Sequence, residues 1–183
     1  MPLSPPVKRV QKHTREVKCF GYEREDGLWD IEGRIADTKT YSFENRDRGT
    51  IASGTPVHEM LIRITVDDTL VIHKIEATTE AGPFNICPEI IDNLKALEGL
   101  RIGPGWTKQV HSKIGGVRGC THVNQLLLGP LATTAYQTLV PRWVEKSQGK
   151  KPDKRPVIID TCHAFAADGE FVKREWPDYY TGD

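Results

Sequence analysis

The side chains with the strongest potential for chemistry lie near the middle of the chain, where Cys120 and His122 follow the glycine-rich segment 115–119. The residues after Cys120 have the apolar density and the helix-forming residues of a helix start, which predicts a thiol at a helix N-terminus. Unpaired N–H groups and a partial positive charge at such a position stabilise a thiolate and lower the pKa of a cysteine. His122 could act there as acid, base or metal ligand. A buried structural cysteine beside a surface histidine is the competing interpretation.

His58 is the second candidate for proton transfer. It stands at the start of the apolar segment 57–66 and follows the polar segment 38–56, and connections of that length are often lids or binding loops. Alternation places His58 on the face of Met60 and Ile62, where a strand would hold it rigidly within reach of solvent. A neutral core histidine bonded to the backbone is the structural alternative.

Further side chains complete a candidate site for a carboxylated, acyl or aromatic small molecule. Arg63 could clamp a carboxylate with two parallel hydrogen bonds. Glu76 joins His58, Cys120 and His122 among the candidate catalytic groups. The aromatic residues suited to contacting such a substrate are Trp29, Tyr22 and Trp106.

The cysteines and histidines also permit a metal site. Thiolate and imidazole favour zinc or iron, with three ligands plus water in a catalytic site and four ligands in a structural one. The spacing matches no standard zinc knuckle, and a loop would have to bring positions 162 and 163 together because adjacent strand residues face opposite sides. No nucleotide cofactor is expected, since the chain has neither a Walker loop nor a dinucleotide fingerprint. The candidate metal ligands are Cys120, His122, Cys162, His163 and Cys87.

The elements that must position these residues are predicted from apolar spacing and turn residues. Alternation on both sides of a turn at 25–27 predicts a hairpin over 15–35, with Trp29, Ile31 and Ile35 on one face. A second antiparallel pair is predicted to follow along the chain. Its strands cover 56–66 and 70–79.

Helical spacing of leucine and isoleucine predicts a helix from Pro88 to about Gly99, and a second helix begins at about Thr121. Two shorter apolar segments, 156–160 and 168–172, are predicted as strands near the end of the chain. The predicted fold class is therefore α+β, an antiparallel sheet of about four to six strands packed against two or three α-helices.

Length, charge and cysteine content narrow the class of protein. For the 183 residues we expect a flexible N-terminal arm over 1–12 and a single α+β domain over 13–183. Acidic and basic residues number 25 each, so the chain has no excess of positive charge that would attract nucleic acid or an anionic membrane. No apolar run has the length of a signal-peptide core or a membrane span, and four scattered cysteines fit a reducing cytoplasm. The expected partner is a small-molecule substrate, and a homo-oligomer is compatible with the same features.

Four motifs occur in a characteristic order: the stretch 22–33, the segment 56–60 around His58, the segment 119–122, and the segment 162–164. Together they resemble a bacterial family catalogued as domain-of-unknown-function family 2889. The resemblance covers nearly the whole chain and implies a bacterial, single-domain, cytosolic protein. It brings no established activity, so the functional argument rests on the residues.

Three interpretations of the protein's function, each from a different class, fit these candidate residues. The first is a small-molecule enzyme without an organic cofactor, a lyase, isomerase or hydrolase that works by acid–base chemistry. The second is a protein whose Cys/His site binds zinc or iron. A non-catalytic ligand-binding module built on the same sheet is the third.

Overall fold

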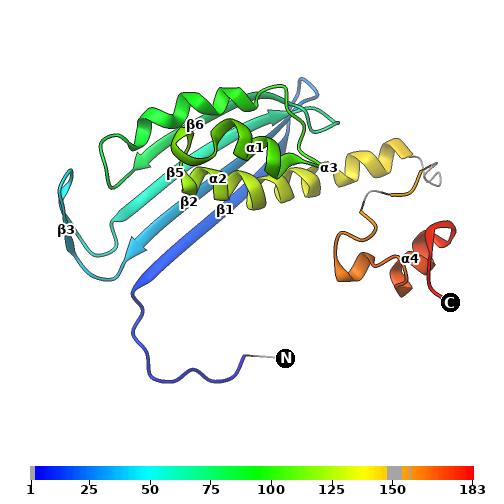
Figure 1. The fold of residues 1–183 in the computed structure, drawn as a ribbon, viewed down its shortest axis with the longest axis horizontal. Coiled ribbons are helices and arrows are strands. Elements are labelled where there is room, and N and C mark those ends of the chain that lie inside the picture. The colour runs from blue at the N-terminus through cyan, green and yellow to red at the C-terminus, as the bar shows by residue number, and fades with distance from the viewer. Residues whose placement is uncertain (1–2, 148–153, 157) are drawn as a thin grey trace. The chain divides into compact units, whose positions relative to one another are not determined.

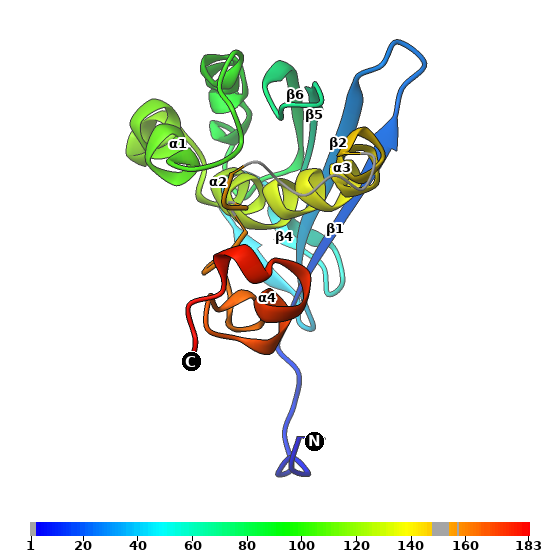
Figure 2. The same ribbon diagram turned by 90° about the vertical axis from the view of Figure 1, so that its right-hand side faces the viewer.

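The computed structural model describes residues 3–147, 154–156 and 158–183. The chain forms two compact units, Met1–Leu139 and Val140–Asp183, and each is described by itself. The first unit combines a four-stranded sheet, a separate two-stranded sheet and helices, which is the α+β class predicted from the sequence (Figures 1 and 2). In the described part of the chain, no helix has both the length and the apolar character needed to cross a membrane.

The larger sheet is antiparallel throughout, with the strand order β1-β2-β5-β6. β1 and β2 form the predicted hairpin, and its turn contains Gly27 at φ 81°, a conformation that glycine adopts without steric cost. β5 and β6 are the two predicted apolar strands, and residues 3–12 before β1 are exposed. The bounds of the strands are β1 (His13–Glu23), β2 (Trp29–Lys39), β5 (Pro56–Val66) and β6 (Ile72–Ala81).

The polar segment 38–56 is more ordered than the irregular connection expected from its composition. β2 continues to Lys39, and β3 (Phe43–Asn45) then pairs with β4 (Gly49–Ile51) as a small hairpin. Asn45 accepts hydrogen bonds at its side-chain oxygen from the N–H groups of Asp47 and Arg48, which closes the turn of this hairpin.

One face of the four-stranded sheet carries the apolar core. Odd positions of β2 and even positions of β5 share this face because side chains alternate along a strand, and the buried pair Ile35 and Met60 is one example. The next pair on that face toward the end of β2 is Asp37 and His58. The apolar row of the core therefore ends in a polar pair.

Helices lie over this core face (Figure 1). A π-helical turn, Leu127–Leu131, joins α2 (Thr121–Leu126) to α3 (Ala132–Ser147), and it contains Pro130, whose missing N–H interrupts the α-helical bonding. The two helices predicted from the sequence are thus present, the first as a 3-10 helix over Cys87–Leu97 and the second as α2. Between them lies α1 (Trp106–Ile114).

The second unit has a small apolar core of its own. Its buried residues pack against partly buried aromatic side chains. α4 (Glu170–Glu175) and short 3-10 turns surround this core. The core comprises Ile159, Ala167 and Val172, packed against Trp176, Tyr179 and Tyr180.

Both strands predicted near the end of the chain are wrong for the described residues. Ile159 lies in a turn that ends at Asp160, which has φ 67° and accepts a hydrogen bond from the N–H of Ala167 at 2.9 Å. Residue 157 of this prediction lies outside the described residues. The segment 168–172 enters α4 instead, because a short apolar run does not distinguish a strand from a buried helical turn.

Candidate active site

Asp37 lies near the end of β2 and is buried, with 3% of its surface exposed. Its cross-strand neighbours are Arg15 on β1 and His58 on β5. The pairing of β2 with β5 shifts register directly after Asp37, and such irregularities re-aim side chains near functional sites. Three adjacent strands therefore direct polar groups to one place.

Two side chains of β1 hold the Asp37 carboxylate. Arg15 donates from Nε to Oδ1 at 2.8 Å and from Nη2 to Oδ2 at 2.7 Å, and His13 Nε2 lies 2.7 Å from Oδ1. Burial raises the pKa of Asp37, but the hydrogen bonds from Arg15 and His13 outweigh it and lower the pKa to about 2. Asp37 is therefore ionised at neutral pH and fixed in orientation by a bidentate pair.

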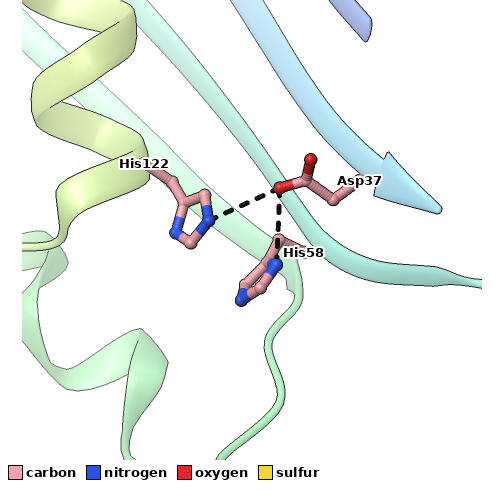
Figure 3. A group of neighbouring side chains, drawn as sticks. All are labelled: Asp37, His58 and His122. Carbon is pink, nitrogen blue, oxygen red and sulfur yellow. Dashed lines mark ion pairs between the residues drawn. The ribbon is translucent and has the colours of Figure 1, made fainter. Parts of the chain in front are cut away.

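Two stacked imidazoles face the other side of the carboxylate, one from β5 and one from α2 (Figure 3). His58 Nδ1 and His122 Nε2 each lie 3.4 Å from Asp37 Oδ2. The ring centroids are 3.9 Å apart and the ring planes are inclined by 27°. Burial, followed by the charge of the neighbouring His122, lowers the pKa of His58, so the neutral form of His58 is favoured.

Cys120 lies beside the other ring nitrogen of His122, with Sγ 3.7 Å from Nδ1. As the sequence predicts, Cys120 directly precedes a helix, at the N-cap of α2. Burial raises the pKa of the Cys120 thiol, but the contact with His122 and the N–H groups of Val123 and His122 outweigh it and lower the pKa. The two nitrogens of His122 thus connect a thiol to a buried carboxylate.

Contacts around α2 fix the position of His122 over the sheet. A Cβ at Gly119 would lie 2.0 Å from the carbonyl oxygen of Ile114, so this close approach requires glycine. The side-chain amide of Asn124 donates to the same carbonyl at 3.0 Å. Gln125 accepts a hydrogen bond from Arg15 Nη1 at 2.6 Å, so Arg15 joins Asp37 to the helix that carries His122.

Arg63 and Glu76, both predicted to act at the site, lie on the opposite face of the sheet. Arg63 pairs with Glu32 at 2.7 Å and reaches Glu76 at 3.9 Å. Glu32 and Asp37 face opposite sides of β2, because side chains alternate along a strand. The structure therefore brings neither the predicted carboxylate clamp nor Glu76 to the histidine pair.

The three aromatic candidates have other surroundings. Trp29 is buried and donates from its indole nitrogen to Asp68 at 2.8 Å. Trp106 is also buried and donates to the carbonyl oxygen of Leu127 at 3.3 Å. Tyr22 is exposed on the outer face of the sheet, and substrate contact by these aromatic residues stays a prediction.

The metal ligands predicted from the sequence are divided between the two units. Cys120 contacts His122, but Cys87 begins the 3-10 helix, and Cys162 and His163 are exposed in the second unit. Within the residues described, a different set of possible ligand atoms lies within 4.8 Å of one another. That set consists of Asp37, His58 and His122.

The structure thus unites three predicted site residues, His58, Cys120 and His122, with others that sequence reasoning missed. Asp37 is in phase with the buried residues of β2, so alternation alone places this carboxylate on the core face, where it requires partners. Arg15 belongs to an edge strand with mostly exposed residues, and nothing in its local pattern marks it as a partner.

The fold and the site define an α+β domain in which a buried, ionised carboxylate faces a pair of histidines and a nearby thiol. A match to a known family extends over residues 13–137, which include the four-stranded sheet, α1, α2 and every residue of this cluster. The chain belongs to that family, which is described as "Protein of unknown function (DUF2889)". No curated protein and no solved structure gives a significant match.

Proposed function

We propose that the first unit is a small-molecule enzyme in which Cys120, His122 and Asp37 act as nucleophile, acid–base group and orienting carboxylate. The observation that carries the proposal is the position of His122 between the other two, with Nδ1 3.7 Å from Cys120 Sγ and Nε2 3.4 Å from Asp37 Oδ2. A nucleophile within reach of a base that a third group orients is the arrangement of covalent catalysis.

The ionised carboxylate decides which nitrogen of His122 carries the proton. Asp37 accepts but cannot donate at neutral pH, so a proton on Nε2 is favoured. Nδ1 is then free to accept the thiol proton of Cys120. The N–H groups of His122 and Val123 in the first turn of α2 lower the pKa of Cys120 and stabilise the thiolate that results.

We call the group of Cys120, His122 and Asp37 the relay. The reaction that suits this relay is transfer of an acyl group to water. The Cys120 sulfur attacks the acyl carbon as its proton moves to His122 Nδ1, and a thioester forms when the leaving group departs with that proton. Water then attacks the thioester while His122 takes one of its protons. The acid leaves, and His122 returns the proton to Cys120 Sγ.

A lyase or isomerase that moves a proton without a covalent intermediate is the second candidate function. The observation in its favour is the second imidazole, because His58 stacks on His122 and its neutral form can accept a proton. In this case Cys120 lines the site but forms no bond to the substrate. Both candidates act on carboxylated, acyl or aromatic small molecules.

Alkylation by iodoacetamide tests the relay without a known substrate. At pH 7, peptide mass spectrometry follows the labelling rate of each cysteine, and Cys162 serves as an exposed internal reference. We expect Cys120 to react about tenfold faster than Cys162 although it is less exposed, because the thiolate is the reactive form. His122→Gln should remove most of this advantage.

A matched control is His73→Gln, which changes a histidine paired with Asp67 in another part of the sheet. It should leave the labelling of Cys120 within about twofold of the unmodified protein, since surface changes far from a site have small effects. Equal rates at Cys120 and Cys162, or no response to His122→Gln, would contradict the relay.

The hydrolysis of p-nitrophenyl acetate separates the two candidate functions. A burst of p-nitrophenol equal to the enzyme concentration indicates an acyl-cysteine, and Cys120→Ser should abolish it. The labelling of Cys120 can depend on His122 while neither this ester nor an acyl thioester gives a burst. That result would favour the lyase or isomerase, which moves a proton without a covalent intermediate.

A further inference from the structure

We infer that Asp37, His58 and His122 form a binding site for a divalent transition-metal ion, which takes the place of the proton between His122 Nε2 and Asp37 Oδ2. Two imidazoles and one carboxylate are the donors that zinc and its neighbours accept, with an additional position left for water. The site uses ligands from β2, β5 and α2, and includes no cysteine.

The separations between the carboxylate oxygen and the two histidine nitrogens suit a tetrahedral ion. Metal–nitrogen and metal–oxygen bonds of about 2.1 Å place neighbouring ligand atoms about 3.4 Å apart, because a tetrahedron edge is about 1.63 bond lengths. His58 Nδ1 and His122 Nε2 both lie 3.4 Å from Asp37 Oδ2.

The Asp37 carboxylate retains an acceptor position for the ion. An ionised carboxylate offers about four lone-pair directions. Arg15 and His13 use two on Oδ1, and Arg15 uses one on Oδ2. One direction on Oδ2 remains, and this oxygen faces the two imidazoles (Figure 3).

The histidine rings must turn to share an ion. They are stacked at 27°, whereas coordination places the metal in the plane of each ring. The Cβ–Cγ torsion of histidine is broad, so a rotation of one ring is available without a rotamer change. The side chains of His58 and His122 are 23% and 18% exposed, so an ion and its water can reach them.

Cys120 supports the site without binding the ion. Its sulfur lies at Nδ1 of His122, and one imidazole cannot direct both nitrogens to the same metal. A metal on Nε2 leaves the remaining proton on Nδ1, where it donates to sulfur. Such an outer hydrogen bond fixes the orientation of a metal-bound histidine.

Occupation of the site switches the relay off, a consequence that rests on the proposed function. Catalysis requires His122 to hold a proton on Nδ1 and another on Nε2 at one stage of the cycle. The metal takes the position of the Nε2 proton, so His122 can no longer carry protons on both nitrogens as the catalytic cycle requires. Zinc would therefore act as an inhibitor of the enzyme, while the binding site itself does not depend on the reaction.

Titration of the EDTA-treated full chain with Co²⁺ tests the site through visible absorption, with Zn²⁺ added afterwards as competitor. We expect one Co²⁺ per chain, displaced by Zn²⁺. His58→Gln should weaken Co²⁺ binding by at least about a hundredfold, because it removes one of the three ligands. Cys120→Ser should change the affinity by less than about threefold, because the serine hydroxyl can still accept the hydrogen bond from Nδ1 of His122. Far-UV circular dichroism verifies that each variant folds.

His163→Gln is the matched control, because it removes an exposed histidine of the second unit and should leave Co²⁺ binding unchanged. Absent binding, equal binding by His58→Gln, or loss of binding in Cys120→Ser overturns the site. Cys120 labelling in EDTA is measured in parallel. His122-dependent labelling without Co²⁺ binding overturns only the metal site, and Co²⁺ binding without such labelling overturns only the relay.

Discussion

Arg15 and Asp37 face each other across the β1–β2 pair, and the guanidinium donates to both carboxylate oxygens, at 2.8 and 2.7 Å. Through Nη1, the same guanidinium also reaches Gln125 on α2 at 2.6 Å. One side chain therefore fixes the orientation of the buried carboxylate and ties it to the helix that carries His122.

Removal of Arg15 should destabilise the protein, because the buried Asp37 would lose its bidentate partner. For Arg15→Gln we expect a decrease of about 1–2 kcal/mol in the free energy of unfolding, since Arg15 is itself partly solvated. Urea denaturation followed by circular dichroism measures this change. Arg63→Gln is the control, because its pair with Glu32 is solvent-exposed and should be worth less than about 1 kcal/mol. Similar losses in both variants would contradict a special role for Arg15.

Asp67 should make the stability of the sheet depend on acid. Burial raises the pKa of Asp67, but the hydrogen bonds from His73, Thr69 and the N–H groups of Thr69 and Val71 outweigh it and lower the pKa to about 2. A carboxylate whose pKa is lower in the folded state contributes stability above its unfolded pKa of about 3.9, and loses it as the pH falls toward 2.

The measurement compares the unmodified chain with Asp67→Asn by urea denaturation at pH 6, 4 and 2.5. We expect the advantage of the unmodified chain, about 1–2 kcal/mol at pH 6 after solvent screening, to shrink by pH 2.5. A difference that does not vary with pH would show that the charge of Asp67 contributes nothing.

Gly119→Ala should disturb the thiol end of the site. Its Cβ would meet the carbonyl oxygen of Ile114 at 2.0 Å, so the backbone before Cys120 must shift. We expect a loss of about 1–3 kcal/mol in stability together with slower labelling of Cys120. Gly129→Ala is the matched control, because its added Cβ would meet no atom within 4 Å apart from its chain neighbours and the backbone of its own helix, and it should be neutral. A stable Gly119→Ala protein with unchanged labelling would contradict this prediction.

Val172→Ala should loosen the second unit, whose small core contains this residue at 0% exposure. Loss of two buried methyl groups costs about 1–2 kcal/mol, a large fraction of what so small a core supplies. Hydrogen exchange of residues 158–183, followed by mass spectrometry, should become faster. Val144→Ala changes an exposed valine of α3 and should have no effect on that exchange. Equal protection in both variants would mean that Val172 adds nothing to the core.

Local patterns sufficed to predict most of the first unit. Alternation around a glycine turn predicts the hairpin of β1 and β2, because a strand repeats every two residues and Gly27 permits the turn. The helix that follows Cys120 is equally local. The prediction of two strands near the end of the chain was wrong, because apolar segments as short as 168–172 carry no periodicity that distinguishes a strand from a helical turn.

The sequence by itself determined the types of reactive groups and the segments that carry them, including His58 at the start of a strand and Cys120 before a helix. It also contained the phase that places Asp37 on the core face. Only the tertiary structure decided which groups meet. The register of β1, β2 and β5 and the packing of α2 bring together segments that are distant in the chain. The spacing of residues within one segment does not predict the contact between Asp37, His58 and His122, because they belong to three different segments.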